Sequence, residues 1–244
     1  MRIAVLSDIH ANLAALEAVI GDLPPVEETW VLGDIVGYGP QPREVIETLQ
    51  EIGARSVMGN HDGAAIGLVQ SRYFNPDART AIEWTAEALD ANARSYLASL
   101  PEVRVDEPLT AVHGSPRDPM WEYITGPDVA EANIGAFETR LCLFGHTHQP
   151  VIFHDIDGEI ETTPGRPGSR APIDAATRVL VNPGSVGQPR DGNPDAAYAI
   201  VDVDRSGQAL VEFRRVTYDI ARTQRLMQEA GLPPRLAERL LHGR

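Results

Sequence analysis

The chain has 244 residues, of which 43% are hydrophobic and 23% are charged, and its formal net charge is −14. This composition is ordinary for a globular protein and excludes wholesale disorder, while the acidity offers no general attraction to polymeric nucleic acid or to an anionic membrane. We therefore expect a single domain over 1–244, with neither of these among its partners.

The first half of the chain alternates short apolar runs with helical patterns, which is typical of strand–helix–strand units. Strands are predicted at 3–6, 30–32 and 55–58, and the helices between them end at Gly21 and Gly53. The first apolar run stops at Asp8, too early for a signal peptide or a membrane span, so a cytoplasmic location is the default expectation.

The region from about 63 to 100 is rich in Ala, Glu, Leu and Arg. It predicts a helix over 77–99, with or without a break, and we interpret the whole region as a helical insertion or cap. Strands are then expected at 103–105, 110–112 and 141–144. The only cysteine, Cys142, lies inside the last of these apolar runs, which indicates a buried, inert thiol and excludes a disulfide within the chain.

The second half has the pattern of an antiparallel sheet. Strands are predicted at 151–156, 179–181, 196–203 and 209–216, with a turn at 204–207 and a Pro/Gly/Arg-rich loop over 162–178. The tail at 218–242 has helical spacing in two pieces separated by Pro233 and Pro234, and we expect it to pack on the sheet.

Polar clusters follow five of the predicted strands, at the point where each strand ends. They are Asp8-Ile9-His10, Gly33-Asp34, Gly59-Asn60-His61-Asp62, His113-Gly114 and Gly145-His146-Thr147-His148. Because the carboxyl ends of parallel strands meet at one edge of a sheet, these side chains are expected to converge there. Each cluster alone is more typical of a capped loop or a satisfied histidine pair, so it is the set of five that predicts a site.

Asp and Asn oxygens combined with neutral imidazoles suit Mn, Fe, Zn or Co, and the absence of cysteine ligands argues against structural zinc. Two such ions about 3.5–4 Å apart can activate a water molecule and clamp the oxygens of a phosphoryl group. Asp34 is a candidate to bridge two divalent metal ions through its two carboxylate oxygens.

The order D-x-H, GD, GNH, H, GHTH resembles the calcineurin-like metallophosphoesterase superfamily over roughly 1–188, including the segment 181–187. The resemblance implies a four-layer α/β/β/α sandwich of two mixed sheets flanked by helices. It also implies two sets of metal ligands: Asp8, His10, Asp34 and His148 for one ion, and Asp34, Asn60, His113 and His146 for the other. His61 matches the histidine that protonates the leaving-group oxygen or stabilises the transition state, the alternative being a residue that orients a ligand.

One departure from the superfamily bears on the substrate. Ser/Thr protein phosphatases and symmetrical diadenosine tetraphosphatases carry a phosphate-gripping arginine shortly after GD, and here Tyr38 stands in that place. The chain therefore looks more like the small bacterial phosphoesterases, which include phosphodiesterases and nucleoside-polyphosphate hydrolases.

Arg117 and Arg190 are candidate replacements for the missing arginine, although a surface arginine is more often only a solvated charge. Four aromatic residues are candidates to stack on a base or an aryl group, with core packing as the alternative for each. They are Tyr38, Tyr73, Phe74 and Trp121.

These features predict a dinuclear-metal-dependent phosphoesterase, in which a metal-bridging hydroxide attacks a phosphate mono- or diester, with Asp34 and His61 as catalytic residues. Nucleotides and dinucleoside polyphosphates are among the candidate substrates. Two alternatives stay open: a non-catalytic binding module on the same fold, and a two-metal hydrolase of a non-phosphate substrate such as an amide.

Overall fold

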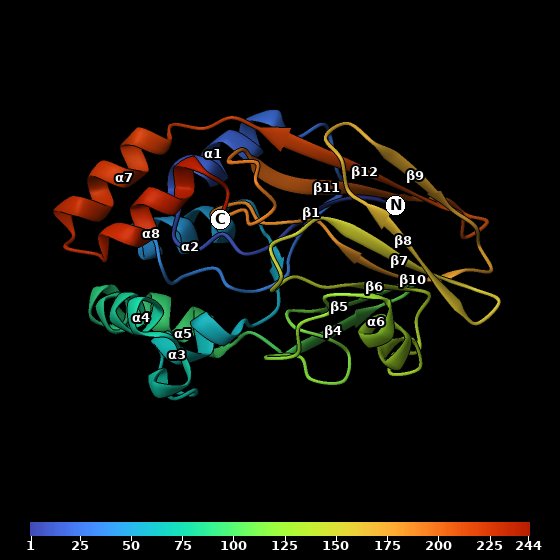
Figure 1. Ribbon diagram of the computed structural model, residues 1–244, viewed down its shortest axis with the longest axis horizontal. Helices are drawn as coiled ribbons and strands as arrows, with labels where there is room; N and C mark the ends of the chain where they lie inside the picture. Colours follow the sequence, from blue (N-terminus) through green and yellow to red (C-terminus); the bar gives the residue numbers. More distant parts are fainter.

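The computed structural model describes residues 1–244 and contains two mixed six-stranded sheets that face each other, with helices outside them (Figure 1). The first sheet has the strand order β3-β2-β1-β11-β12-β9 and the second has the order β4-β5-β6-β10-β7-β8. The strands of the first sheet are β1 (Arg2–Leu6), β2 (Glu28–Val31), β3 (Arg55–Ser56), β9 (Arg170–Ile173), β11 (Ala196–Val203) and β12 (Ala209–Val216). Those of the second are β4 (Val103–Asp106), β5 (Leu109–Val112), β6 (Leu141–Leu143), β7 (Val151–Ile156), β8 (Glu159–Pro164) and β10 (Arg178–Asn182).

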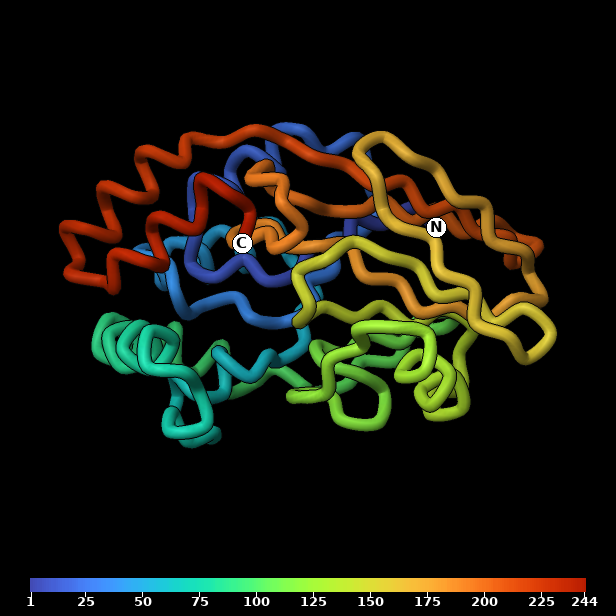
Figure 2. The backbone as a smooth tube through the Cα atoms, viewed as in Figure 1, coloured from blue at the N-terminus to red at the C-terminus, as the bar shows by residue number.

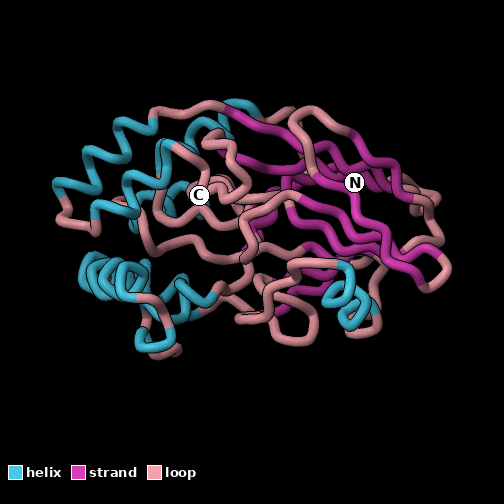
Figure 3. The backbone as a smooth tube through the Cα atoms, in the orientation of Figure 1, coloured by secondary structure: helices cyan, strands magenta, loops and turns pink.

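The helices fall between and after these strands. They are α1 (Leu13–Asp22), α2 (Pro42–Glu51), α3 (Asn60–Ala65), α4 (Pro76–Ala88), α5 (Ala91–Ala98), α6 (Pro127–Ile134), α7 (Ile220–Glu229) and α8 (Pro234–Glu238), with 3₁₀ turns η1 (Ser71–Tyr73) and η2 (Arg239–Leu241). Most of them gather at one end of the molecule, and the long strands extend toward the other (Figure 3). None of the helices combines the length and the apolar character that crossing a membrane requires.

Alternate residues of each strand face opposite sides of its sheet, and this alternation produces the layers. In β1, Ile3 and Val5 join the apolar cluster between the sheets, whereas Ala4 and Leu6 join a second cluster under the helices. The second cluster includes residues of α1, α2 and α5, and a third packs α6 on the outer face of the other sheet. The predicted α/β/β/α sandwich is confirmed.

Parallel pairing brings the site to one edge. Strands β1, β2 and β3 run parallel to one another, and so do β5, β6 and β10. The carboxyl ends within each group therefore lie together, and each strand of the two groups except β10 is followed by one of the five polar clusters.

The predicted loop over 162–178 is wrong, because it contains the end of β8 and all of β9. Both are edge strands, paired on one side only, and much of their surface is exposed, so they lack the apolar pattern of inner strands. Pro172 lies in β9, where an edge strand tolerates a residue without an N–H.

The other helices and strands differ less from their predicted boundaries. The helix expected over 77–99 is broken into α4 and α5, with Asp90 capping α5 through its side chain. Helix α6 follows Gly126 and was not predicted. The strand expected at 55–58 is only the short β3, while the tail has the expected two pieces, α7 and α8. Figure 2 shows this tail, in red, returning beside the blue N-terminal segment.

Candidate metal centre

A first group of donors comes from two strand ends. Asp8 and His10 follow β1, His148 follows β6, and all three side chains are buried. His148 Nε2 lies 3.3 Å from Asp8 Oδ1 and 3.3 Å from His10 Nε2. The three donor atoms are close enough to one another to hold a single metal ion.

A second group lies beside the first and joins both sheets. Asp34 follows β2 of the first sheet, whereas His113 and His146 follow β5 and β6 of the second. His113 Nε2 lies 3.4 Å from Asp34 Oδ2 and 2.9 Å from His146 Nδ1. These three residues are also buried and also fit around one ion.

Asp34 connects the two groups. Its Oδ2 lies 3.7 Å from His10 Nε2 in the first group and 3.4 Å from His113 Nε2 in the second. Its Oδ1 accepts a hydrogen bond of 2.9 Å from the backbone N–H of His61. Oδ2 is therefore the Asp34 oxygen that faces imidazole nitrogens of both groups, while Oδ1 faces the backbone of His61.

Backbone carbonyls fix the tautomers of three of the histidines. The Nδ1 atoms of His10, His113 and His148 lie 3.2, 2.8 and 2.6 Å from the carbonyl oxygens of Val36, Leu32 and Gln188. Since a carbonyl only accepts, each Nδ1 carries a proton and donates it, and Nε2 is the ring nitrogen that faces the centre.

The third strand end supplies Asn60 and His61, which open the short helix α3. Asn60 Oδ1 is buried without a hydrogen-bond partner, as is Asp8 Oδ1. Both are oxygen atoms of the kind that divalent cations accept as ligands. The structure thus brings all seven residues expected to be ligands to one place at the strand ends.

His61 is surrounded by rings. The centroid of its imidazole lies 4.4 Å from that of Tyr38, 4.8 Å from that of Phe74 and 5.0 Å from that of His10. Its Nδ1 faces the backbone of Gly37, where a Cβ atom would lie 2.5 Å away. Burial lowers the pKa of His61 to about 4.

Burial and neighbouring opposite charges shift the pKa values of the ligand residues in opposite directions. Burial raises the pKa of Asp8 to about 7. Burial alone would lower the pKa of His113, but the carboxylates of Asp34 and Asp8 raise it to about 9. Burial also lowers the pKa of His10 and His148, which stay neutral. The carboxylates of Asp8 and Asp34 therefore favour positive charge in this pocket, as the raised pKa of His113 shows.

The backbone at this edge is strained. Asp8, Asp34 and His146 adopt φ angles of 52°, 51° and 66°, in the left-handed region that side chains other than glycine rarely enter. Such conformations cost about 1–3 kcal/mol each and cluster at functional sites. They are held by hydrogen bonds such as that from Asp8 N to the carbonyl of Gly33, 3.1 Å.

Of the two candidate arginines, the structure brings only Arg190 close to the metal centre. The Arg190 guanidinium lies 5.9 Å from the centroid of the Tyr38 ring, and its charge lowers the pKa of His148, after the larger effect of burial. Arg117 instead pairs with Glu122 at 3.6 Å on the surface, so it is not brought to the centre. Tyr38 is buried and lies beside His10 and His61.

The other candidate aromatic residues form a chain that begins at His61. The ring centroids of Phe74 and Trp121 lie 5.3 Å apart, and those of Trp121 and Tyr73 lie 6.2 Å apart. Tyr73 is 64% exposed, which leaves its ring open to solvent. These rings therefore form a wall from the metal centre to the surface.

Sequence reasoning missed several supporting residues. The Ser7 hydroxyl donates to Asp8 Oδ2 at 2.6 Å, and the Asp62 carboxylate accepts from the backbone N–H groups of Val36 and Gly59. Asp62 lies in a cluster already singled out, but no sequence signal marks Tyr123, whose ring stacks on His146 with centroids 3.7 Å apart.

The residues present fit a pair of divalent cations. Each group offers carboxylate oxygen and imidazole nitrogen, the N/O chemistry that first-row divalent ions prefer, and backbone hydrogen bonds set which imidazole nitrogen faces inward. Cys142, with its pKa raised by burial, lies outside both groups.

Comparison with known proteins supports this assignment. The family model described as a calcineurin-like phosphoesterase superfamily domain matches residues 1–206. The chain is 36% identical to the uncharacterized protein MJ0912 of Methanocaldococcus jannaschii over 99% of this chain and 98% of that protein. It is 27% identical to the phosphodiesterase YfcE of Escherichia coli K12, covering 84% of this chain and 89% of YfcE.

A solved structure matches the whole fold. The crystal structure of a metallophosphoesterase from Sphaerobacter thermophilus superposes with a TM-score of 0.90 and 46% sequence identity, and the match covers 100% of both chains. The likeness therefore includes the C-terminal helices, which lie beyond the residues that the family model matches.

Proposed function

The chain belongs to the calcineurin-like phosphoesterase superfamily, whose members are phosphoric ester hydrolases, and we propose that it hydrolyses a phosphate mono- or diester with two divalent cations. The observation that carries this proposal is the pair of buried His/Asp groups joined by Asp34. Such a pair meets the need of phosphoryl transfer for concentrated positive charge at one point.

We assign the ligands as the resemblance implied. Asp8, His10, Asp34 and His148 hold one ion, in line with the contacts of His148 and His10 to Asp8. The second ion is held by Asp34, His113, His146 and the otherwise unpartnered Asn60 Oδ1. The donor set suits Mn, Fe, Zn or Co.

When bound, the two cations activate a water molecule and neutralise charge on the phosphoryl oxygens. The protein contributes the positions of the ligand groups and of the catalytic side chains. Asp34 sets the spacing of the two ligand groups, and its Oδ1 hydrogen bond to the backbone N–H of His61 ties the two catalytic residues together. His61 presents Nε2 to the leaving-group oxygen, where it donates a proton or a hydrogen bond as the P–O bond breaks.

The surroundings of His61 favour an ester with an aromatic leaving group, such as an aryl or nucleoside ester. The chain of rings through Phe74, Trp121 and Tyr73 begins beside the nitrogen proposed to meet that group. Stacking on such rings tolerates any flat group. The name of the relative YfcE, a phosphodiesterase, supports diesters among the substrates.

A direct test uses metal-depleted protein to which Mn²⁺ is returned, with p-nitrophenyl phosphate, bis-p-nitrophenyl phosphate and p-nitroacetanilide as substrates. We expect metal-dependent turnover of one or both phosphate esters and none of the anilide. Metal binding without any turnover would favour the non-catalytic module, and turnover of the anilide alone would favour a non-phosphate hydrolase.

A further inference from the structure

One of the four ligand histidines lacks the support that the other three have. His10, His113 and His148 each donate Nδ1 to a backbone carbonyl, which fixes the orientation of the ring. In His146, Nε2 is buried without a hydrogen-bond partner in the protein. Its Nδ1 lies 2.9 Å from Nε2 of His113, but His113 belongs to the same ligand group and is not an outside anchor. No hydrogen bond therefore ties the ring of His146 to the protein outside the centre.

The backbone of His146, in contrast, is firmly held. Its N–H donates to Asp8 Oδ2 at 3.1 Å, and its φ angle of 66° lies in the left-handed region. These features set the position of the side chain's first atoms but not the rotation of the imidazole about its side-chain bonds. A metal ligand needs both, because the ring nitrogen has to point at the ion. Another contact must therefore orient the ring.

Tyr123 makes that contact. Its ring lies nearly parallel to the imidazole of His146, with centroids 3.7 Å apart and an angle of 18° between the planes. The ring of His113 meets the same imidazole edge-on, with centroids 4.6 Å apart. A ring packed flat against the imidazole resists its rotation, because rotation would drive the two rings into each other. The stack therefore holds the plane of His146.

The loop that follows β5 holds Tyr123 in its turn. Glu122, the preceding residue, accepts on Oε2 from the Ser115 hydroxyl at 2.6 Å and from Asn133 Nδ2 of α6 at 2.8 Å. The same loop begins at His113. One braced segment therefore carries both a ligand of the second group and the ring that packs on another ligand of that group.

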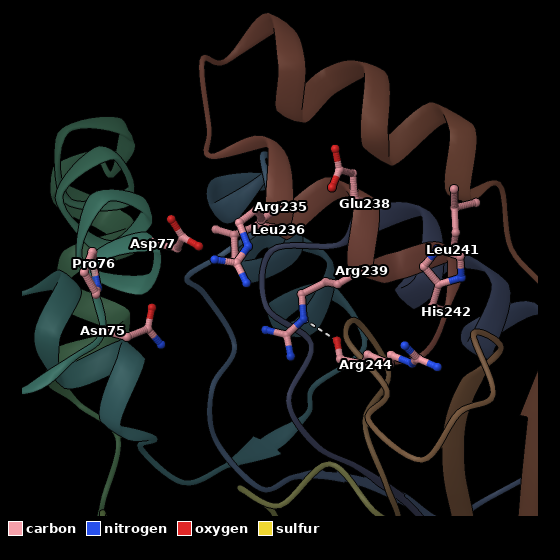
Figure 4. A pocket seen from close by; sticks show the side chains of 10 residues that line it. All are labelled: Asn75, Pro76, Asp77, Arg235, Leu236, Glu238, Arg239, Leu241, His242 and Arg244. Atoms are coloured by element: carbon pink, nitrogen blue, oxygen red, sulfur yellow. Dashed lines mark hydrogen bonds between the residues drawn. The ribbon is translucent and has the colours of Figure 1, made fainter.

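An open cavity beside the C-terminal tail is separate from this stack. Its volume is about 860 Å³, and Figure 4 shows the side chains that line it between the tail and the start of α4, among them Asp77, Arg235 and Arg239. None of its lining residues belongs to either ligand group or to the loop that carries Tyr123. The cavity therefore has no part in orienting His146.

We propose that Tyr123 is a positioning residue for the second metal ion, whose ring orients His146 by stacking where a backbone carbonyl orients each of the other three ligand histidines. The role belongs to the flat face of the ring, so phenylalanine should fulfil it and an aliphatic side chain should not. The proposal rests on the proposed function, through the assignment of His146 as a ligand. It adds a residue that none of the five polar clusters contains.

Calorimetric titration of metal-depleted protein with Mn²⁺ tests this role without turnover. We expect Tyr123→Leu to weaken one of the two binding events about tenfold or more and to leave the other unchanged, since losing the residue behind a ligand costs about 10–100-fold in affinity. Tyr123→Phe should bind both ions as the wild type does. Tyr96→Leu is the matched control and should also bind like the wild type, because Tyr96 is a half-buried tyrosine of α5 that contacts Ser56 and no ligand histidine.

Tyr123 is 47% exposed, so Tyr123→Leu should keep the circular dichroism of the wild type. Tyr123→Met also replaces the ring by an apolar side chain, and it takes the place of the leucine variant if that variant does not fold. Equal Mn²⁺ affinities in the ringless variant and the wild type would overturn the proposal. A loss in Tyr123→Phe as large as that in Tyr123→Leu, or an equal weakening of both ions, would overturn it as well.

Kinetics with p-nitrophenyl phosphate separate the orientation of a ligand from contact with the substrate. Tyr123→Leu should need more Mn²⁺ for half-maximal activity, and its kcat should approach that of the wild type at saturating Mn²⁺. A low kcat in Tyr123→Phe with both ions bound would assign the role to the hydroxyl and contradict the stacking role. A wild type that binds two ions but has no turnover would refute the proposed function, while selective loss of one ion from Tyr123→Leu would still support the role of Tyr123.

Discussion

Three histidines of the centre each give one ring nitrogen to a backbone carbonyl and turn the other inward. This arrangement costs backbone strain at Asp8 and Asp34, and hydrogen bonds from neighbouring strand ends hold it. At the scale of single residues, the Nε2 atoms therefore already point at the centre, which lowers the cost of ordering the site when an ion binds.

Asp34→Asn tests the residue that both ligand groups share. The amide removes the negative charge next to His10 and His113 while keeping the shape of the side chain. We expect kcat/KM to fall at least about 100-fold, since changing even a residue behind a ligand costs 10–100-fold. Circular dichroism should show an unchanged fold.

Glu87→Gln is the control for this change, because Glu87 is an exposed carboxylate of α4 remote from the ligand groups. It should keep wild-type kinetics. Near-wild-type activity in Asp34→Asn would remove Asp34 from the bridging position.

His61→Ala separates a catalytic role from a supporting one. Loss of proton or hydrogen-bond donation should lower kcat about 10²–10⁴-fold with the metal content per chain unchanged. Elemental analysis and steady-state kinetics check this together. His154→Ala, a half-buried histidine of β7, should change neither quantity. Loss of metal from His61→Ala would instead make His61 a ligand or a residue that orients one.

At the scale of elements, Asn12 links three parts of the chain. Its Oδ1 caps α1 through Ala15 N and accepts from the Thr223 hydroxyl of α7, while its Nδ2 donates to the carbonyl of Gly187. The first helix, the loop after β10 and the C-terminal tail are therefore held together by one buried amide beside the metal centre.

Asn12→Ala should lower the free energy of unfolding by about 2–4 kcal/mol, because it removes a helix cap and leaves buried polar groups unpaired. Urea denaturation measures this. Asp90→Ala removes only the exposed cap of α5 and should cost about 1 kcal/mol. Equal costs for the two variants would contradict the linking role of Asn12.

The elements also show where sequence reasoning succeeds. Inner strands such as β1 are apolar on both faces and end in ligand clusters, so both the strand and its function can be predicted. Edge strands such as β9 carry no such pattern, and α6 has only the Gly126-Pro127-Asp128 start to mark it. Tyr123 reaches its place on His146 through tertiary packing, which local sequence does not encode.

At the scale of the whole molecule, the two sheets meet so that each supplies half of the metal centre. Asp8, Asp34 and Asn60 come from the first sheet, and His113 and His146 from the second. Ions bound between them join the two halves, so metal binding and global stability are expected to be coupled.

Removal of metal should therefore destabilise the fold. A ligand at 100 times its Kd adds about 2.7 kcal/mol per site. For two sites in a chain of this size, Mn²⁺ should raise Tm by roughly 10–20 °C over the EDTA-treated protein. Differential scanning calorimetry measures the shift, and Asp34→Asn should reduce it. A Tm that does not respond to Mn²⁺ would contradict the coupling.

The most direct measurement is the anomalous scattering of a crystal of the Mn²⁺-loaded protein. Two peaks about 3.5–4 Å apart are expected, one bounded by Asp8, His10 and His148 and the other by Asn60, His113 and His146, with Asp34 between them. A single peak, or peaks away from these residues, would contradict a dinuclear centre at the shared edge of the two sheets.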